Sequence, residues 1–100
     1  MTSASEPSDA SIAPDVVAAY ARDIALHAQG VSGLARRGVR VSLQGGRVDL
    51  ELHLTCELGA ALPTVCRQVA DRVRAYVAEM TDVAVGTVAV MVDAVVPPGR

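Results

Sequence analysis

The sequence has very few aromatic residues. It contains no Trp and no Phe, and two Tyr are the only aromatic side chains among its 100 residues. Hydrophobic residues still make up 51% of the chain, so a core must be built from Val, Leu, Ile and Ala. Proteins that hold single-stranded nucleic acid stack the bases on aromatic side chains. The composition therefore argues against that kind of binding surface.

The chain also lacks a large excess of charge of either sign and a long hydrophobic run. Nine basic and eleven acidic residues give a net charge of −2, which offers no electrostatic footprint for nucleic acid or for an anionic membrane. No apolar segment approaches the roughly 20 residues that span a bilayer, so direct membrane insertion is not expected. Residues 1–14 show neither the basic start nor the apolar stretch of a signal peptide. The chain is therefore expected to stay in the cytoplasm.

Cysteine is scarce as well. Cys56 and Cys66 lie ten residues apart, form no CxxC motif, and each falls on the inward side of its predicted element. Two buried thiols that pack as small apolar residues are expected. The sequence therefore predicts no metal and no cofactor.

The N-terminal part of the chain predicts a tail and a helix. Residues 1–13 are rich in Ser, Ala and Pro and lack periodicity, so they are expected to be a flexible tail. A helix is predicted from Pro14, because Pro is favoured in the first turn and Asp15 lies near the positive end of the helix dipole. Its apolar stripe consists of Val17, Tyr20, Ile24 and Ala28. Gly30 is expected to end the helix in the left-handed conformation, and residues 31–38 are expected to form a connection.

A strict alternation over residues 47–54 predicts a strand that covers a core on one face and meets water on the other. The apolar positions are Val48, Leu50, Leu52 and Leu54, and the polar positions are Arg47, Asp49, Glu51 and His53. A second alternating run covers residues 39–44, and Gly45-Gly46 separates the two runs. Because glycine adopts the positive φ of a primed turn without steric cost, this pattern predicts an antiparallel hairpin.

The C-terminal part predicts a long helix and a last strand. Apolar residues at helical spacing indicate a helix from about Leu62 to Met80, and alternating valines follow over residues 83–95. A slip of phase at Gly86-Thr87 predicts a β-bulge, and residues 97–100 are expected to be a short tail. The element order is therefore α-β-β-α-β, in a single α+β domain over residues 14–96.

Handedness and packing then predict the sheet. A strand–helix–strand crossover is right-handed in nearly every known case, which places the last strand parallel to the strand that begins at Arg47. The expected architecture is a three-stranded mixed sheet with both helices packed on its apolar face. The simplest arrangement places the strand over residues 39–44 in the middle.

The two histidines give no convincing catalytic site. His27 lies near the end of the first helix, where a partly buried imidazole or a cation facing the dipole is expected. His53 lies on the polar face, where it could form an ion cluster with Glu51 and Asp49. Residues at i, i+2 and i+4 of a flat strand provide no pocket that excludes water, so neither an enzyme nor a small-molecule substrate is expected.

The connection over residues 31–38 is the predicted partner-binding site. Val31 and Leu34 flank the basic pair Arg36 and Arg37, which suggests a small apolar contact ringed by charge. Loops carry binding more often than scaffold residues do. The polar face of the sheet is the second candidate for a binding surface.

Several segments together resemble the alkaline shock protein family of bacterial envelope stress response proteins. The match extends over roughly residues 16–96. The segments that carry it are Gln29-Gly30-Val31-Ser32-Gly33-Leu34, Gly38-Val39-Arg40-Val41, Val48-Asp49-Leu50-Glu51-Leu52-His53-Leu54, Leu62-Pro63-Thr64-Val65 with Gln68-Val69, Met80-Thr81-Asp82-Val83, and Val88-Ala89-Val90-Met91-Val92. The chain departs from the family pattern at Leu58 and Met91, where an aromatic residue and an Asn are common.

The resemblance implies a function without catalysis. It implies a small cytoplasmic protein that associates with the inner face of the cell envelope through a membrane-anchored protein partner and supports the response to envelope stress. Unpaired strand edges further predict a weak homo-oligomer. Three other functions are kept as alternatives: a K-homology-like nucleic-acid-binding domain, a regulatory subunit of a metabolic enzyme and, last, a small enzyme. The K-homology alternative is disfavoured because the GXXG loop between two helices is absent.

Overall fold

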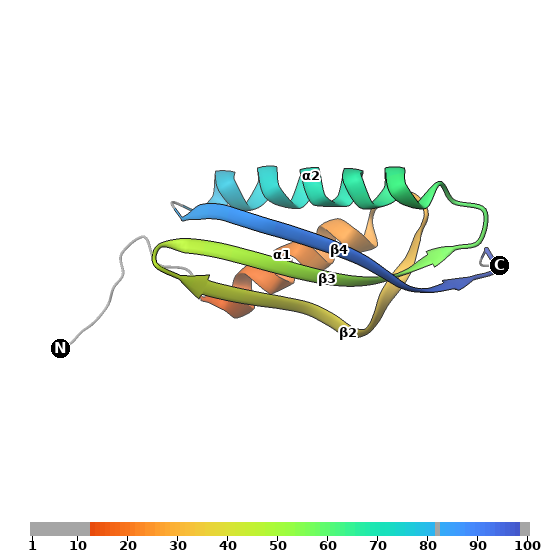
Figure 1. Ribbon diagram of the computed structural model, residues 1–100, viewed down its shortest axis with the longest axis horizontal. Helices are drawn as coiled ribbons and strands as arrows, with labels where there is room; N and C mark the ends of the chain where they lie inside the picture. The colour runs from red at the N-terminus through yellow and green to blue at the C-terminus, as the bar shows by residue number, and fades with distance from the viewer. Residues whose placement is uncertain (1–12, 82, 99–100) are drawn as a thin grey trace.

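Two helices cover one face of a three-stranded sheet, and the other face is open (Figure 1). The computed structural model describes residues 13–81 and 83–98. In chain order the elements are α1 (Pro14–Leu26), β2 (Val31–Gln44), β3 (Arg47–Glu57), α2 (Leu62–Met80) and β4 (Ala84–Val96). This confirms the predicted α+β class and element order. Most of the predicted N-terminal tail (residues 1–12) and the last residues of the predicted C-terminal tail (99–100) lie outside the described residues.

Helix α1 buries only part of the predicted stripe and ends earlier than expected. Pro14 lies in its first turn, and its buried residues are Val17, which was predicted, and Ala21 and Ala25, which were not, whereas Tyr20 and Ile24 are half-buried. The helix ends at Leu26 with His27 as its C-cap, so the prediction that Gly30 caps it was wrong. Gly30 lies beyond the helix and has the predicted left-handed conformation, with a φ of 90°. Helix α2 also begins with a Pro in its first turn, and it buries one valine on each successive turn: Val65, Val69, Val73 and Val77. Within the described residues no helix is long and apolar enough to cross a membrane.

The predicted hairpin is confirmed, but its first strand is much longer than expected. Gly45 and Gly46 have φ values of 56° and 77°, which suit a primed turn, and the register joins Gln44 to Arg47 across it. Strand β2 begins at Val31, because Val31 pairs with Cys56 and Leu34 pairs with Leu54. The predicted connection over residues 31–38 is therefore mostly strand.

A wide bulge interrupts β2. Between the Leu34–Leu54 pair and the Val39–Leu52 pair, β2 has the four residues 35–38 where β3 has only His53. The bend of β2 at this point is visible at the lower edge of Figure 1. Bulges interrupt the ladder and bend the strand that carries them. The basic pair Arg36-Arg37 is thereby pushed out from the line of the sheet.

Strand β3 occupies the middle of the sheet, so the prediction that the strand over residues 39–44 is central was wrong. The order is β2-β3-β4, with β2 antiparallel and β4 parallel to β3. The inward side chains of β3, from Val48 to Cys56, are all 3% exposed or less, whereas their neighbours on β2 and β4, apart from Val31, are partly exposed. The strand with the largest aliphatic side chains gains most from burial and therefore takes the central position.

Strand β4 contains two bulges. The first lies at Gly86-Thr87, as predicted, since Val48 pairs with Val85 but Leu50 pairs with Val88. The second inserts Asp93, because adjacent residues Leu54 and Thr55 pair with Val92 and Ala94. This second bulge was not predicted. It shifts the alternation of β4 near its end, so Asp93 and Ala94 both belong to the open face.

The core lies between the sheet and the helices. Helix α1 packs mainly on β2, and α2 packs mainly on β4. The core is aliphatic, as the composition predicted, and it includes the free thiol of Cys56, which is 0% exposed. Cys66 is only half-buried, on the side of α2.

Candidate functional site on the open face of the sheet

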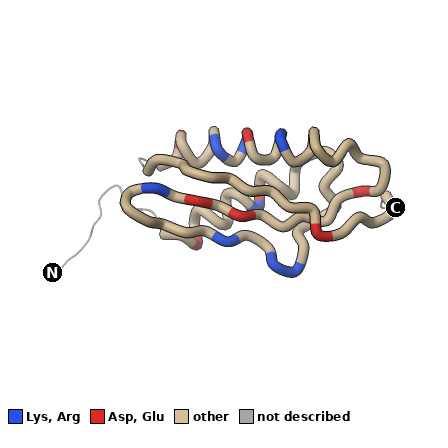
Figure 2. The backbone as a smooth tube through the Cα atoms, in the orientation of Figure 1, with Lys and Arg blue, Asp and Glu red and all other residues tan. Residues whose placement is uncertain are grey.

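Charged side chains of both signs cover the face of the sheet that the helices leave open. Arg36, Arg37 and Arg40 lie on the edge strand β2, all exposed, and we refer to these three residues as the basic ridge. Figure 2 shows these basic positions along one edge, with acidic positions beside them on β3. Within residues 13–81 and 83–98, none of the three arginines forms an ion pair. The ridge therefore presents positive charge that the fold itself does not neutralise.

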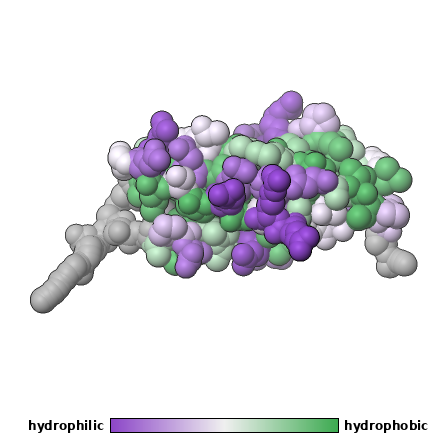
Figure 3. Space-filling model, turned by 60° about the horizontal axis from the view of Figure 1, so that its bottom comes forward, coloured by the Kyte–Doolittle hydropathy of each residue, from purple (hydrophilic) through white to green (hydrophobic). Residues whose placement is uncertain are grey.

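The surface around the ridge is mixed. In Figure 3, hydrophilic side chains gather in the middle of the visible face, and hydrophobic side chains flank them towards both ends. Among the exposed apolar side chains of β4, Met91 pairs in register with His53 of the open face and is 39% exposed, whereas Val95, at 43%, pairs with Cys56, whose side chain faces the helices. Protein–protein interfaces usually place apolar side chains at the centre and polar ones at the rim. The open face has charge at its centre, so what it offers a partner is mainly charge.

His53 lies on this face but is almost completely buried, with 1% of its surface exposed. Its Nε2 is 2.6 Å from Glu51 Oε2, and its Nδ1 is 2.9 Å from Asp93 Oδ2. An ionised carboxylate only accepts hydrogen bonds, so both ring nitrogens must carry a proton to satisfy both contacts. The hydrogen bond with Glu51, and then the hydrogen bond with Asp93, raise the pKa of His53 above 6.5, although burial opposes this.

The predicted ion cluster is thus confirmed for one partner and wrong for the other. Glu51 contacts His53, as expected, but Asp49 does not. The second carboxylate is Asp93 of β4, which sequence reasoning missed. Strand β4 meets β3 only after the helical crossover, and the bulge that directs Asp93 towards His53 leaves no signal in the local alternation of β3.

Asp49 belongs to a separate cluster at the first bulge of β4. Its Oδ1 accepts the backbone N–H of Thr87 at 2.8 Å, and its Oδ2 accepts Arg47 Nη2 at 3.3 Å. The hydrogen bond from Thr87 and the charge of Arg47 lower the pKa of Asp49 below 3.8, against the opposing effect of desolvation. Gly86 leaves the room for this contact, since a Cβ there would collide with the side chains of Asp49 and Arg47.

Helix α2 fixes the same bulge from its own side. Arg74 Nη1 donates to the carbonyl oxygens of Gly86 at 2.8 Å and Val85 at 3.4 Å. These carbonyls belong to the edge strand β4. The guanidinium therefore satisfies backbone groups that a bulge removes from the regular ladder.

The four residues of the predicted partner-binding site separate into two groups. Arg36 and Arg37 are exposed in the β2 bulge, as that prediction requires. Val31 is 9% exposed and pairs with Cys56, and Leu34 packs against the core. The two apolar residues therefore stabilise the fold instead of forming a surface contact, because this segment is strand and both side chains face the helices. Partner binding by the arginines remains a prediction.

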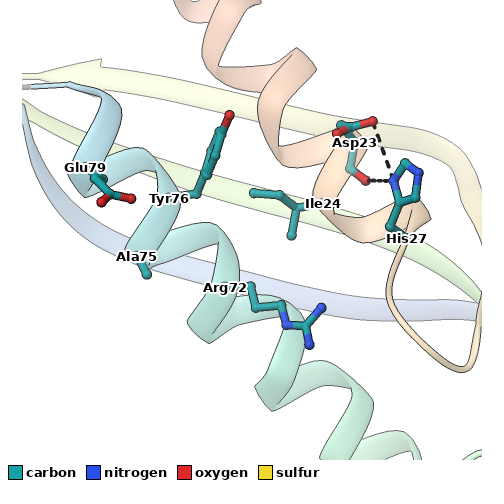
Figure 4. A pocket seen from close by; sticks show the side chains of 7 residues that line it. All are labelled: Asp23, Ile24, His27, Arg72, Ala75, Tyr76 and Glu79. Carbon is teal, nitrogen blue, oxygen red and sulfur yellow. Dashed lines mark hydrogen bonds and ion pairs between the residues drawn. The ribbon is translucent and has the colours of Figure 1, made fainter.

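A hollow lies between the two helices, on the other side of the molecule (Figure 4). It is a shallow groove of about 520 Å³. Its lining residues are Asp23, Ile24, His27, Arg72, Ala75, Tyr76 and Glu79. His27 caps α1, and its Nδ1–H donates to the carbonyl oxygen of Asp23 at 2.8 Å, as the dipole-facing interpretation predicts. Three of the seven lining residues are aliphatic or aromatic, and the other four are Asp, His, Arg and Glu.

Metal ligands do not gather in the described part of the chain. No three His, Cys, Asp or Glu side chains lie close enough together there to hold an ion. In the His53 cluster the two carboxylates lie at different ring nitrogens, so they do not converge on one point. The arrangement suits hydrogen bonding between strands.

Sequence comparison identifies the family. The family model that matches residues 35–97, which include most of β2 and all of β3, α2 and β4, is that of the Asp23 family, described as having a cell envelope-related function. The chain belongs to the Asp23 family. This is the alkaline shock protein family, so the resemblance seen in the sequence is confirmed. The family name has no connection with residue Asp23. No curated protein matches this Asp23-family chain in sequence.

Solved structures with the same fold come from the MamM CTD. One variant of that domain superimposes with a TM-score of 0.57 at 16% identity, covering 80% of this chain and 95% of its own. A nickel form of another variant gives 0.57 at 15% identity, and a manganese form of a third gives 0.56 at 16%, each covering 80% of this chain and 96% of its own. At these identities the likeness shows that the Asp23-family chain shares the fold of that domain.

Proposed function

We propose that the chain is a non-enzymatic module that binds a protein partner at the cell envelope, as part of the response to envelope stress. The observation that carries this proposal is the basic ridge, on a fold that belongs to a family with an envelope-related function. Within the described residues these three exposed arginines form no ion pair, so salt bridges give them no part in stabilising the fold. A partner with negative charge would pair with these arginines and so give them a binding role.

The state of the polar clusters supports a function without catalysis. A general acid or base needs a proton position that faces a substrate. Both ring nitrogens of His53 are already engaged, and Asp49 is held by Thr87 and Arg47. His27 binds its own helix end. Each titratable cluster on the described surface is therefore occupied by neighbours within the chain.

The chemistry of the ridge suggests an acidic protein segment as the partner. Arginine makes bidentate hydrogen bonds with carboxylates, and a bulge presents its side chains away from the sheet. Nucleic acid is a poorer fit, because Asp49, Glu51 and Asp93 on the neighbouring strands would repel a long phosphate backbone. We propose that the acidic segment belongs to a membrane-anchored protein, which would hold this chain at the inner face of the envelope from the cytoplasmic side.

The experiment compares two charge reversals of equal size. The test variant is Arg36→Glu with Arg37→Glu, and the control is Arg67→Glu with Arg72→Glu, which changes two exposed arginines of α2. Tagged proteins are incubated with detergent extracts of membranes, and the captured proteins are quantified. The ridge variant should lose the partner that the wild type and the control retain, with all three showing the same circular dichroism.

Equal capture by all three proteins would reject the ridge as the docking site. Salt-sensitive binding of single-stranded RNA by the wild type would favour the nucleic-acid alternative. Specific recovery of one soluble metabolic enzyme would favour the regulatory-subunit alternative.

Self-association is the second part of the proposal, and the observed strand order changes its basis. The sheet edges are β2 and β4, not β3. Strand β2 is protected by three arginines and a bulge of four residues, whereas β4, although it has two shorter bulges, carries only one charge, Asp93, over its 13 residues. Long apolar edges favour pairing with another chain, so we propose a weak homo-oligomer through β4. Light scattering that shows a strict monomer at high concentration would contradict it.

A further inference from the structure

His53 lies where irregularities of both neighbouring strands meet. On one side, β2 has the bulge 35–38 opposite this single residue of β3. On the other side, β4 has the inserted Asp93, whose carboxylate contacts the imidazole. The contact between His53 and Asp93 therefore joins the central strand to the last bulge of the sheet.

The geometry of this contact depends on one proton. A neutral imidazole has one N–H and one lone pair, whereas an imidazolium has two N–H groups. With carboxylates at 2.6 Å from Nε2 and 2.9 Å from Nδ1, a neutral ring would direct a lone pair at one of them. That contact would change from an attractive to a repulsive one. Because Glu51 and Asp93 are 38% and 34% exposed, solvent can exchange the proton.

The charged groups around His53 leave its two carboxylates without another partner. Its own strand contributes Glu51, and β4 contributes Asp93. Strand β2 contributes the basic ridge, with Arg36 and Arg37 in the bulge and Arg40 paired in register with Glu51, but none of these arginines forms an ion pair with either carboxylate in the described structure. Both helices lie on the opposite face of the sheet. Among the described residues, the imidazole of His53 is therefore the one group that pairs with the two carboxylates.

We propose that His53 is a proton-dependent clasp that holds the bulged end of β4 to the central strand. When the ring loses its proton, the shorter contact with Glu51, two residues away on the same strand, is kept, and Asp93 is released. The segment Ala94–Val96, which follows Asp93 at the sheet edge, then loses this side-chain restraint and keeps only its pairing with residues 55–57 of β3. The charge of the cluster changes from −1 to −2 beside the basic ridge, so the clasp also regulates the docking surface, a consequence that rests on the proposed function.

The direction of the pH effect follows from linkage. The partners of His53 raise its pKa in the folded protein above the 6.5 of the unfolded chain. A raised pKa stabilises the fold fully below pH 6.5, and this stabilisation is lost as the pH rises through the pKa of the folded protein. The clasp is therefore closed below pH 6.5 and opens as the pH rises through the pKa of His53 in the folded protein.

The test is a nuclear magnetic resonance titration of the whole chain carrying His27→Gln, so that His53 gives the only histidine signal. At pH 6.5 both ring nitrogens should show the ¹⁵N shifts of an imidazolium, and the titration midpoint should lie above 6.5. The backbone amides of residues 92–95 should shift with the same midpoint. Asp93→Asn should lower the midpoint and remove the coupled amide shifts, and the exposed control Glu79→Gln should do neither.

A midpoint at or below 6.5, a single neutral tautomer at pH 6.5, or amides in β4 that do not follow the titration would overturn the clasp. Asp93→Asn keeps the size of the side chain, so the test does not depend on a His53 substitution that fails to fold. No partner is present in this experiment. If the titration confirms the clasp but the ridge variant still captures the partner, only the proposed docking site is rejected. If the titration contradicts the clasp but the ridge variant loses the partner, only the clasp is rejected.

Discussion

Leu52 provides the most direct test of the packing. Its side chain is 0% exposed and projects from the central strand, between Val39 of β2 and Val90 of β4, towards the helices. Leu52→Ala removes the equivalent of three methylene groups, at about 0.8 kcal/mol each. A remaining cavity of about 50 Å³ adds ~1.2 kcal/mol. The expected loss in the free energy of unfolding is therefore between about 3 and 4 kcal/mol, within the usual range for such changes.

The matched control is Leu43→Ala. Leu43 has the same chemistry on the same side of the sheet, but it lies near the hairpin and is 40% exposed. Its replacement should cost about 1 kcal/mol, because less surface is lost and water fills the space. Glu51, the neighbour of Leu52, is not a suitable control, since it binds His53.

Urea unfolding followed by circular dichroism measures both variants. With an m value of about 2 kcal/mol/M, the urea concentration at the unfolding midpoint should fall by ~2 M for Leu52→Ala and by ~0.5 M for Leu43→Ala. The m value should stay constant. Equal midpoint shifts would show that β3 is not the central strand, or that its register is displaced by one residue.

Three further predictions concern the bulge, the thiols and the acid side of the stability curve. Gly86→Ala should destabilise the fold by about 1–3 kcal/mol, because a Cβ there collides with the Asp49 side chain, while Gly33→Ala, which meets nothing within 4 Å, should be nearly neutral in the same urea assay. In native protein, iodoacetamide should modify the half-buried Cys66 before the fully buried Cys56, because burial raises the pKa of both thiols but leaves only Cys66 accessible to the reagent. Mass spectrometry of the peptides would contradict this if Cys56 reacted first. The lowered pKa of Asp49 stabilises the fold above pH 3.8, and this contribution is lost as the pH falls through the pKa of Asp49 in the folded protein. In Asp49→Asn the free energy of unfolding should therefore decrease less steeply as the pH is lowered. Equal slopes for the variant and the wild type would contradict this.

The fold was largely predictable because most of its signals are local. The alternation over residues 47–54, the Gly45-Gly46 turn and the valine stripe of α2 each determine one element without reference to the others. The bulge at Gly86-Thr87 was visible for the same reason, as a break in a period of two. Strand order was not predictable in this way, since both hairpin strands have an apolar face and only the amount of buried surface places β3 in the middle.

The residues of the site were harder to predict, because their partners are distant in sequence. His53 and Asp93 are 40 residues apart and meet through a bulge. The sequence does contain a signal for this bulge, since Asp93-Ala94 breaks the alternation between Val92 and Val95 as Gly86-Thr87 does between Val85 and Val88, but this second break was overlooked. The segment around Val31 and Leu34 contains glycines and two arginines, which suggest a connection, but its apolar side chains pair with β3 and continue the strand. Local composition therefore predicted the exposed arginines correctly and misjudged the apolar residues beside them.

The central claim is that a protein, not the lipid bilayer, holds this chain at the envelope. The most direct measurement is co-sedimentation of the purified chain with inverted membrane vesicles, before and after protease treatment of the vesicles, with protein-free liposomes of the same lipids beside them. The account predicts binding to the untreated vesicles that disappears after protease treatment and is absent with the liposomes. Binding that survives protease treatment, or equal binding to the liposomes, would contradict it.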